Sequence, residues 1–261
     1  MVTQLTAVWR FRHFLLSLVR HDLRTRYTRS ALGVGWTVVQ PVIMAGVFVL
    51  VFSGVLGMSP GRYAATLLLG LAVWGFIRES LVTGCGAFSD HEKYIRQSLL
   101  PYALYPLRLV LGSAVHAGIA LLVALAAVVL VDGSAEKLAM LPAVLPALAL
   151  LVAAGWAAAT LFAFAQSYFH DTRHLLDVGC QILFFLTPII YSSDVLVDKG
   201  VGWLARLNPV NLFLELIRTP LATGQPPDLK LYLYAAGFTA VLGVLALAAI
   251  RRFQRSLVYH L

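Results

Sequence analysis

The chain has 261 residues, of which 60% are hydrophobic and 12% charged, and its formal net charge is +8. Soluble domains are about half apolar and about a quarter charged, so this composition excludes an ordinary soluble fold and indicates a chain solvated mainly by lipid. The basic residues flank apolar runs and form no stripe with interleaved aromatic side chains, which argues against a nucleic-acid partner. Cys85 and Cys180 lack metal-ligand spacing, and we expect them to be small core residues without a disulfide.

The first predicted element is an amphipathic helix over residues 9–29. Its arginines lie mostly away from an apolar face formed by Phe11, Phe14, Leu15 and Leu18. The segment is too polar to cross a membrane, so we predict that it lies in the cytoplasmic interface. No long apolar run precedes Leu32, and the first span is expected to act as its own insertion signal.

Six later segments approach the roughly 20 apolar residues that a membrane-crossing helix requires. The predicted spans are residues 33–56, 63–84, 104–131, 138–169, 175–191 and 232–250. An even number of spans leaves both termini on one side, and that side then carries twelve Lys and Arg residues against six on the other. The excess of positive charge predicts that both termini are cytoplasmic.

Two segments outside the spans predict short helices. Residues 90–100 predict a short polar helix on the cytoplasmic side, ended by Pro101. Residues 200–221 alternate apolar patches with charges and prolines, which predicts short re-entrant helices on the outer side, after Pro188 has broken the fifth helix.

The predicted fold is therefore an all-α integral membrane protein with six transmembrane helices, in one domain of residues 1–261. Within it, residues 1–30 form the interfacial helix and residues 31–191 hold the first five spans. Residues 192–226 form the re-entrant outer segment, and residues 227–261 form the sixth span and a cytoplasmic tail.

Three motifs together resemble one family of membrane proteins. The first comprises Arg24, Arg26 and Tyr27, then Ser30, Leu32, Gly33, Trp36 and Pro41. The second is FHDTRHLLDVGCQILFFLTPIIY at 169–191, with His170 where the family usually has arginine, and the third is LNPVNLFLELIRTPL at 207–221. In this order they resemble the permease subunits of type 2 ABC transporters that export polysaccharides, and the similarity covers essentially the whole chain.

The resemblance implies a function and a set of partners. Two copies of the permease would form a channel in the cytoplasmic membrane for a polyprenyl-diphosphate-linked glycan, most closely an O-antigen, beside membrane lipids. Two ATP-binding-cassette subunits would drive it, because this sequence contains no G-x-x-x-x-G-K-[ST] phosphate cradle. We therefore expect no enzyme activity, cofactor or metal in this chain, with ATP and magnesium bound by the partner.

The resemblance also assigns roles to particular residues. A coupling helix that docks on the ATPase is predicted at Asp90, His91, Glu92, Lys93, Tyr94 and Arg96, although the residues alone also fit an ordinary capped loop helix. Phosphate recognition is predicted at Arg24, Arg26, Tyr27 and Arg29, where arginine forks suit phosphate oxygens but also serve to anchor the N-terminus.

Two further sets concern the path of the glycan. Sugar contacts are predicted at Phe48, Phe52, Phe185 and Tyr191, against the alternative that they are packing or interfacial aromatics. An outer gate is predicted at Asn208, Glu215 and Arg218, the last two spaced as a helical pair. Ionisable residues inside membrane spans often have a functional role. We nevertheless expect Arg78, Glu79 and Arg108 to form structural ion pairs, with a position near the interface as the alternative for Arg108. His116 is expected to be a packing residue.

Three other classes of protein remain open on the residues alone. A type 2 permease for a lipid or drug fits the same architecture. A membrane enzyme acting on polyprenyl phosphates would need clustered polar residues, and the one such cluster is His170, Asp171, His174 and Asp177, without a third metal ligand at suitable spacing. A channel or secondary carrier is disfavoured by the lack of an inverted repeat.

Overall fold

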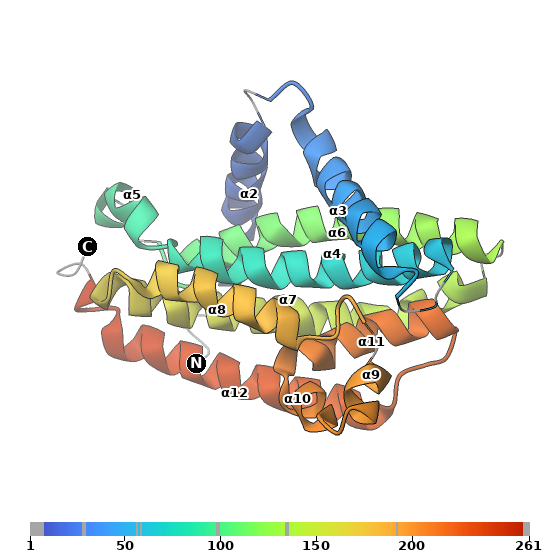
Figure 1. Ribbon diagram of the computed structural model, residues 1–261. Helices are drawn as coiled ribbons and strands as arrows, with labels where there is room; N and C mark the ends of the chain where they lie inside the picture. Colours follow the sequence, from blue (N-terminus) through green and yellow to red (C-terminus); the bar gives the residue numbers. More distant parts are fainter. Residues whose placement is uncertain are drawn as a thin grey trace.

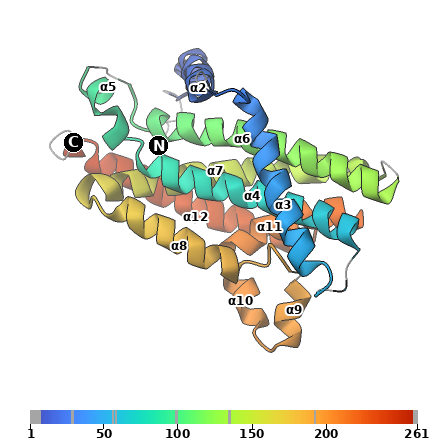
Figure 2. The ribbon, with the colours of Figure 1, turned by 45° about the horizontal axis from the view of Figure 1, so that its top comes forward.

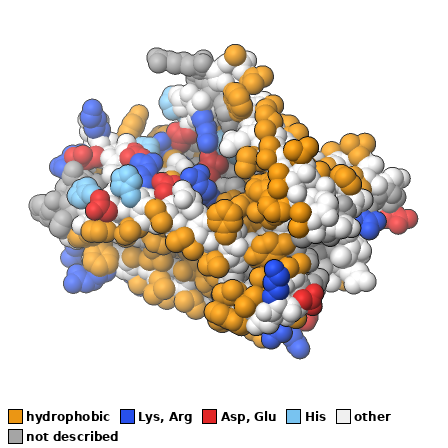
Figure 3. Space-filling model, in the orientation of Figure 1, with side chains coloured by type: hydrophobic (Ala, Val, Ile, Leu, Met, Phe, Trp, Pro, Cys, Tyr) orange, Lys and Arg blue, Asp and Glu red, His pale blue; other side chains and the backbone are white. Residues whose placement is uncertain are grey.

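A computed structural model of the chain describes residues 8–27, 30–55, 57, 59–97, 100–133, 136–191 and 193–257. All regular structure in these ranges is helical. Figure 1 shows long helices lying side by side in a bundle, with α2 and α3 standing against it. Charged side chains gather at the ends of the bundle, beside α2, and over α9 and α10, with mainly hydrophobic surface over the rest of this face (Figure 3). This distribution is the one expected of a protein whose middle zone faces lipid.

Five of the described helices are long and apolar enough to cross a membrane, and they correspond to predicted spans one to four and six. They are α3 (Trp36–Phe52, preceded by the 3-10 turn η1, Gly33–Gly35), α4 (Pro60–Cys85), α6 (Leu104–Asp132), α7 (Leu141–Tyr168, preceded by η3, Glu136–Met140) and α12 (Leu229–Phe253). The first predicted span was too long, because α3 ends at Phe52 rather than near residue 56.

Helix α4 forms the centre of the bundle and contacts α3, α6, α7, α8 and α11. Close approach to α7 depends on glycine, because a methyl group at Gly84 would lie 2.5 Å from the Cβ atom of Ala159. Small residues at such crossings allow membrane helices to pack through their backbones. Helix α3, by contrast, lies against α4 and α6 and leaves most of its surface exposed.

The fifth predicted span differs from the structure. Helix α8 covers Thr172–Leu186 and has 15 residues, about 22 Å of helix, which is short of the roughly 20 residues of a full span. It ends because Thr187 precedes Pro188 and takes an extended conformation, as residues before proline prefer. The prediction that Pro188 breaks this helix is thus confirmed, while the predicted continuation to residue 191 is wrong.

Three helices follow α8: α9 (Ser193–Asp198), α10 (Gly202–Leu207) and α11 (Pro209–Thr223). Helix α11 is an inner element of the bundle, because Leu216, Ile217 and Leu221 are fully buried and the helix contacts α4, α7 and α12. In both ribbon views α8 lies along one part of the bundle's length and α11 along the other (Figures 1 and 2). Together these two short helices cover the length that a single fifth span was predicted to cover.

The predicted interfacial helix corresponds to α2, Arg12–Tyr27, which runs across the direction of the bundle helices (Figure 1). Leu15 and Val19 are buried and pack on Leu104 of α6. Phe14 was predicted for the same apolar face but is 45% exposed. The predicted polar helix at 90–100 comprises the 3-10 turn η2 (Ser89–His91) and α5 (Glu92–Gln97), at one end of the bundle (Figure 1).

Candidate functional site

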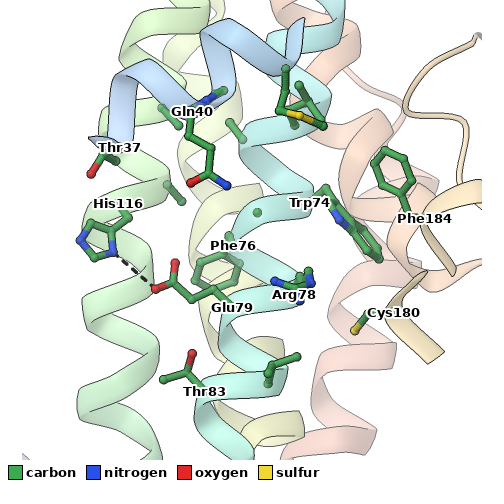
Figure 4. A pocket seen from close by; sticks show the side chains of 18 of the residues that line it. Thr37, Gln40, Trp74, Phe76, Arg78, Glu79, Thr83, His116, Cys180 and Phe184 are labelled. Carbon is green, nitrogen blue, oxygen red and sulfur yellow. Dashed lines mark ion pairs between the residues drawn. The ribbon is translucent and has the colours of Figure 1, made fainter. Parts of the chain in front are cut away.

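A cavity of about 860 Å³ lies between α3, α4, α6 and α8, beside the end of α2. Its lining is polar in one region and aromatic in another (Figure 4). The polar lining includes Arg26, Thr37, Gln40, Arg78, Glu79 and His116, and the aromatic lining includes Trp36, Trp74, Phe76, Phe184 and Phe185. Two further cavities differ from it: one is lined by residues of α12, including Arg251 and Arg252, and the other by largely apolar residues of α7, α12 and the segment before α12.

Two neighbouring residues of α4 direct their charges to different partner helices. Successive residues of an α-helix point about 100° apart, so Arg78 faces α8 while Glu79 faces α6. Arg78 Nη2 donates to Asp177 Oδ1 at 3.0 Å. The prediction that Arg78 pairs with a carboxylate on another helix is confirmed.

Glu79 is the centre of a three-residue cluster that we call the cavity triad: Arg26, Glu79 and His116. An Arg26 guanidinium nitrogen forms an ion pair and hydrogen bond with Glu79 Oε1, and it lies 3.2 Å from His116 Nδ1. His116 Nδ1 is 3.5 Å from the same carboxylate oxygen (Figure 4). The triad therefore joins the last turn of α2 to both α4 and α6, and His116 has a charged neighbour in addition to the packing role predicted for it.

The predicted phosphate-binding residues are distributed around this cluster. Arg26 lines the cavity, with 51% of its side chain exposed, and Arg24 is exposed two residues earlier in α2. Tyr27 is the last residue of α2, and Arg29 lies outside the described residues. The sequence motif did not identify Glu79 and His116 as neighbours of Arg26, because they lie 53 and 90 positions further along the chain.

A run of aromatic rings continues the cavity wall. Phe48 lies 6.0 Å from Phe52 and 6.4 Å from Phe184 between ring centroids, and Phe184 lies 5.5 Å from Trp74. Such separations are typical of packed aromatic pairs. Of the four predicted sugar contacts, Phe48 and Phe52 lie in this run, and Phe185 lines the cavity with 69% of its surface exposed.

The structure adds a local contact for Tyr191 and two further rings to the aromatic run. Tyr191 donates its hydroxyl to the Phe185 carbonyl at 2.9 Å, so it closes the turn after α8. Trp74 and Phe184 connect the aromatic run and were absent from the predicted set. Nothing in the sequence distinguishes these two rings from other membrane aromatics, since only the packing of α8 on α4 brings them together.

The predicted coupling helix, which we call the coupling segment (η2 and α5), combines an anchor with an exposed surface. Ile95 is buried, while Tyr94 is 62% exposed. Glu92 accepts a hydrogen bond from Arg96 Nε at 2.7 Å, one helical turn away. Asp90 lies 3.7 Å from Arg173, at the start of α8. Lys93 is exposed, so the segment presents charged and aromatic groups to the outside of the bundle.

His91 connects this segment to the interior. Its Nδ1 lies 3.1 Å from the Ala87 carbonyl, and its Nε2 lies 2.8 Å from Arg108 Nη2. Burial, followed by the nearby Arg108 charge, lowers the pKa of His91 below its usual value. The histidine is therefore neutral at pH 7 and can accept a hydrogen bond from the guanidinium.

Arg108 completes a path from the coupling segment to α2. It is only 7% exposed, its Nη2 donates to Asp22 Oδ1 at 3.0 Å, and its Nε also lies 3.0 Å from Asp22 Oδ2. Structural pairing of Arg108 is confirmed, because Asp22 of α2 provides its charge partner. His91, Arg108 and Asp22 thus connect three separate elements through side chains.

The three residues predicted for the outer gate surround the turn that follows α8. Asn208 caps α11 by accepting from the Val210 amide at 2.9 Å and donates to Thr187 Oγ1 at 2.8 Å. Glu215 accepts from Ser193 at 2.8 Å. Arg218 donates to the Pro188 carbonyl at 2.8 Å. These contacts fix α11 to the turn after α8.

The histidine and aspartate cluster at the start of α8 was considered for an enzyme. Within the described ranges, no three His, Cys, Asp or Glu side chains gather closely enough to hold a metal ion. His170, Asp171, His174 and Asp177 therefore do not form such a group, and Asp177 instead pairs with Arg78.

The apolar helices and the sparsely charged middle zone define a multi-pass integral membrane protein. Residues 13–221, from α2 to α11, match the family model described as ABC-2 type transporter. The chain belongs to this family, and it is the permease type of subunit that the three motifs predicted. The family is one of transporter permeases, so the chain is not itself the ATPase.

Two relatives extend the comparison. The chain is 25% identical over 246 residues to a Myxococcus xanthus protein named O-antigen export system permease protein RfbA, covering 93% of each chain. It is 24% identical over 197 residues to a Klebsiella pneumoniae protein of the same name, covering 75% of each chain.

Proposed function

We propose that this chain is the membrane-spanning subunit of an ATP-driven exporter that moves a lipid-linked polysaccharide of the O-antigen type across the cytoplasmic membrane. The observation that carries the proposal is the similarity to the Myxococcus xanthus permease over 93% of both chains. The cavity supports it, because cationic groups and aromatic faces in one chamber match a substrate with a diphosphate and sugar rings.

Two copies of the chain form the channel in this proposal. The cavity opens between α3 and α8, and both helices expose apolar side chains beside it, among them Met44, Val47, Ile182 and Phe185. A second copy would cover these faces and close the cavity into a path. Both termini lie in the cytoplasm, and α8 together with the outer segment through α11 makes the fifth of six crossings.

The substrate is recognised in two parts. Arg24, Arg26, Tyr27 and Arg29 receive the diphosphate, since arginine forks bind phosphate oxygens in pairs. Phe48, Phe52, Phe185 and Tyr191 border the glycan, whose flat C–H faces pack on aromatic rings while its hydroxyl groups remain hydrated. Asn208, Glu215 and Arg218 form the outer gate, where α11 and the turn after α8 separate to release the chain.

Two ATP-binding-cassette subunits drive the cycle and hold ATP and magnesium. The coupling segment docks on them through Asp90, His91, Glu92, Lys93, Tyr94 and Arg96. Movement of this segment reaches α2 through the His91, Arg108 and Asp22 contacts, whose short distances make the three elements move together. The motor thereby controls the helix that carries the phosphate-binding arginines.

The test is reconstitution of the permease with its co-purifying ATPase in vesicles that contain polyprenyl-diphosphate-linked glycan. ATP-dependent appearance of glycan in the opposite compartment is the expected result. The charge reversals Glu92→Lys and Lys93→Glu should reduce ATPase association, whereas Lys137→Glu in η3, away from the coupling segment, should not. Glycan transfer without ATP, transport of a lipid or drug in its place, or the lack of any ATPase partner would overturn the proposal.

A further inference from the structure

The cavity triad occupies an unusual position for three ionisable groups. Glu79 is six residues, about 9 Å, from the end of α4, in a helix that crosses the bundle's apolar zone. Charged groups in such segments are costly and are generally retained for a purpose. Because Arg26, Arg78 and Glu79 all border one cavity, we infer that these charges contact a ligand bound in the cavity.

The arginines of the cavity are satisfied by carboxylates that are only partly buried. Arg26 is 51% exposed and pairs with Glu79, and Arg78 is 50% exposed and pairs with Asp177, which is 37% exposed. The pair of Arg78 and Asp177, exposed on both sides, is worth only about 0.2–1 kcal/mol, while Glu79, the carboxylate of the Arg26 pair, is 21% exposed. A ligand with more oxygens and greater charge can therefore displace the carboxylates.

We propose that Arg26, Arg78 and His116 form a binding site for a diphosphate ester, in which Glu79 takes the place of the phosphate when the site is empty. The inference rests on the proposed function for the nature of the lipid-linked substrate, and it adds Arg78, His116 and Glu79 to the predicted arginines of α2. A diphosphate offers oxygens to two guanidinium groups at once, which the single Glu79 carboxylate does not. Its arrival releases Glu79 from Arg26.

This exchange has a mechanical consequence. In the structure, Arg26 attaches the end of α2 to α4 and α6 through the triad. With a diphosphate between the helices, the same guanidinium holds the ligand, and the end of α2 is released from α4. Substrate binding and the position of α2 are therefore linked at the residue that both ligand and Glu79 contact.

The test is binding of undecaprenyl diphosphate to the full-length permease in nanodiscs of zwitterionic lipid, without nucleotide. Glu79→Gln removes the competing charge with little change of shape, and we expect binding about two- to fivefold tighter. Arg78→Ala and Arg26→Ala lose charge-assisted hydrogen bonds and should bind about tenfold or more weakly. Glu79→Asp should restore wild-type affinity, and Arg62→Ala, at the opposite end of α4, serves as the matched control.

Competitors distinguish the possible sources of phosphate. Inorganic diphosphate should compete for the site. If phosphatidylglycerol competes as effectively as undecaprenyl diphosphate, the diphosphate assignment is overturned and the site binds anionic lipids in general. Unchanged or weaker binding by Glu79→Gln would show that the triad is only a structural anchor. That result would leave the proposed exporter function intact, because glycan transport is measured separately in vesicles. Conversely, the predicted binding pattern without glycan transport would count against the exporter function and not against the binding site.

Discussion

Substitution of Arg108 by methionine tests the connection between the coupling segment and α2. The change keeps most of the side-chain length and removes the guanidinium that lies 3.0 Å from Asp22 and 2.8 Å from His91. Removing one partner of a buried charge pair costs about 3–5 kcal/mol. Asp22 is 26% exposed and is partly rehydrated after the change, so we expect a loss of about 2–3 kcal/mol.

Thermal unfolding in detergent, together with hydrogen exchange of α2, measures the effect. At about 2–4 °C per kcal/mol, the melting temperature should fall by roughly 4–12 °C. Exchange in α2 should rise as well, because α2 would then be held against α6 by the packing of Leu15 and Val19 on Leu104 and by the cavity triad, without the charge pair. A double-mutant cycle with Asp22→Asn isolates the pair, and a coupling energy below about 0.5 kcal/mol would refute the proposed connection.

Three further predictions concern other contacts. Gly84→Val places carbon atoms against Ala159 and should destabilise the α4 and α7 crossing by about 1–3 kcal/mol; Gly46→Val in α3, where a Cβ meets nothing within 4 Å, is the control in the same unfolding assay. The pKa of His91 is lowered in the fold, so the coupling segment binds more protons when it is detached from the bundle. Its packing on the bundle should therefore weaken as pH falls from about 6.5 toward the folded pKa. Unchanged hydrogen-exchange protection of residues 87–97 between about pH 7.5 and pH 5.5 would contradict this, and His91→Asn should abolish the response. Asn208→Ala removes a helix cap and the hydrogen bond to Thr187 and should lower the stability of this region by about 1–2 kcal/mol. We expect faster proteolysis of the turn after α8, and equal cleavage rates in wild type and variant would show that these contacts do not hold the turn.

The sequence determined the class of protein and most of its helices. Long apolar runs require membrane helices because backbone groups have no other partners in lipid, and this physical constraint placed five spans within a few residues of their observed bounds. Pro188 determined the end of α8 for a similarly local reason, since it restricts the conformation of Thr187. The motif residues were sufficient to indicate the transporter family.

Tertiary structure decided the partners of the charged groups and the location of the cavity. The charge partner of Arg108 is Asp22, 86 positions away, and the surroundings of Arg26 depend on Glu79 and His116 from two other helices. Apolar periodicity predicted α11 as part of a re-entrant segment on the outer side of the membrane, but it does not determine how this segment packs. Only the tertiary structure shows that Leu216 and Leu221 of α11 are buried in the bundle. Such contacts arise only when distant helices pack, because each side chain's environment is then set by residues that its own segment does not contain.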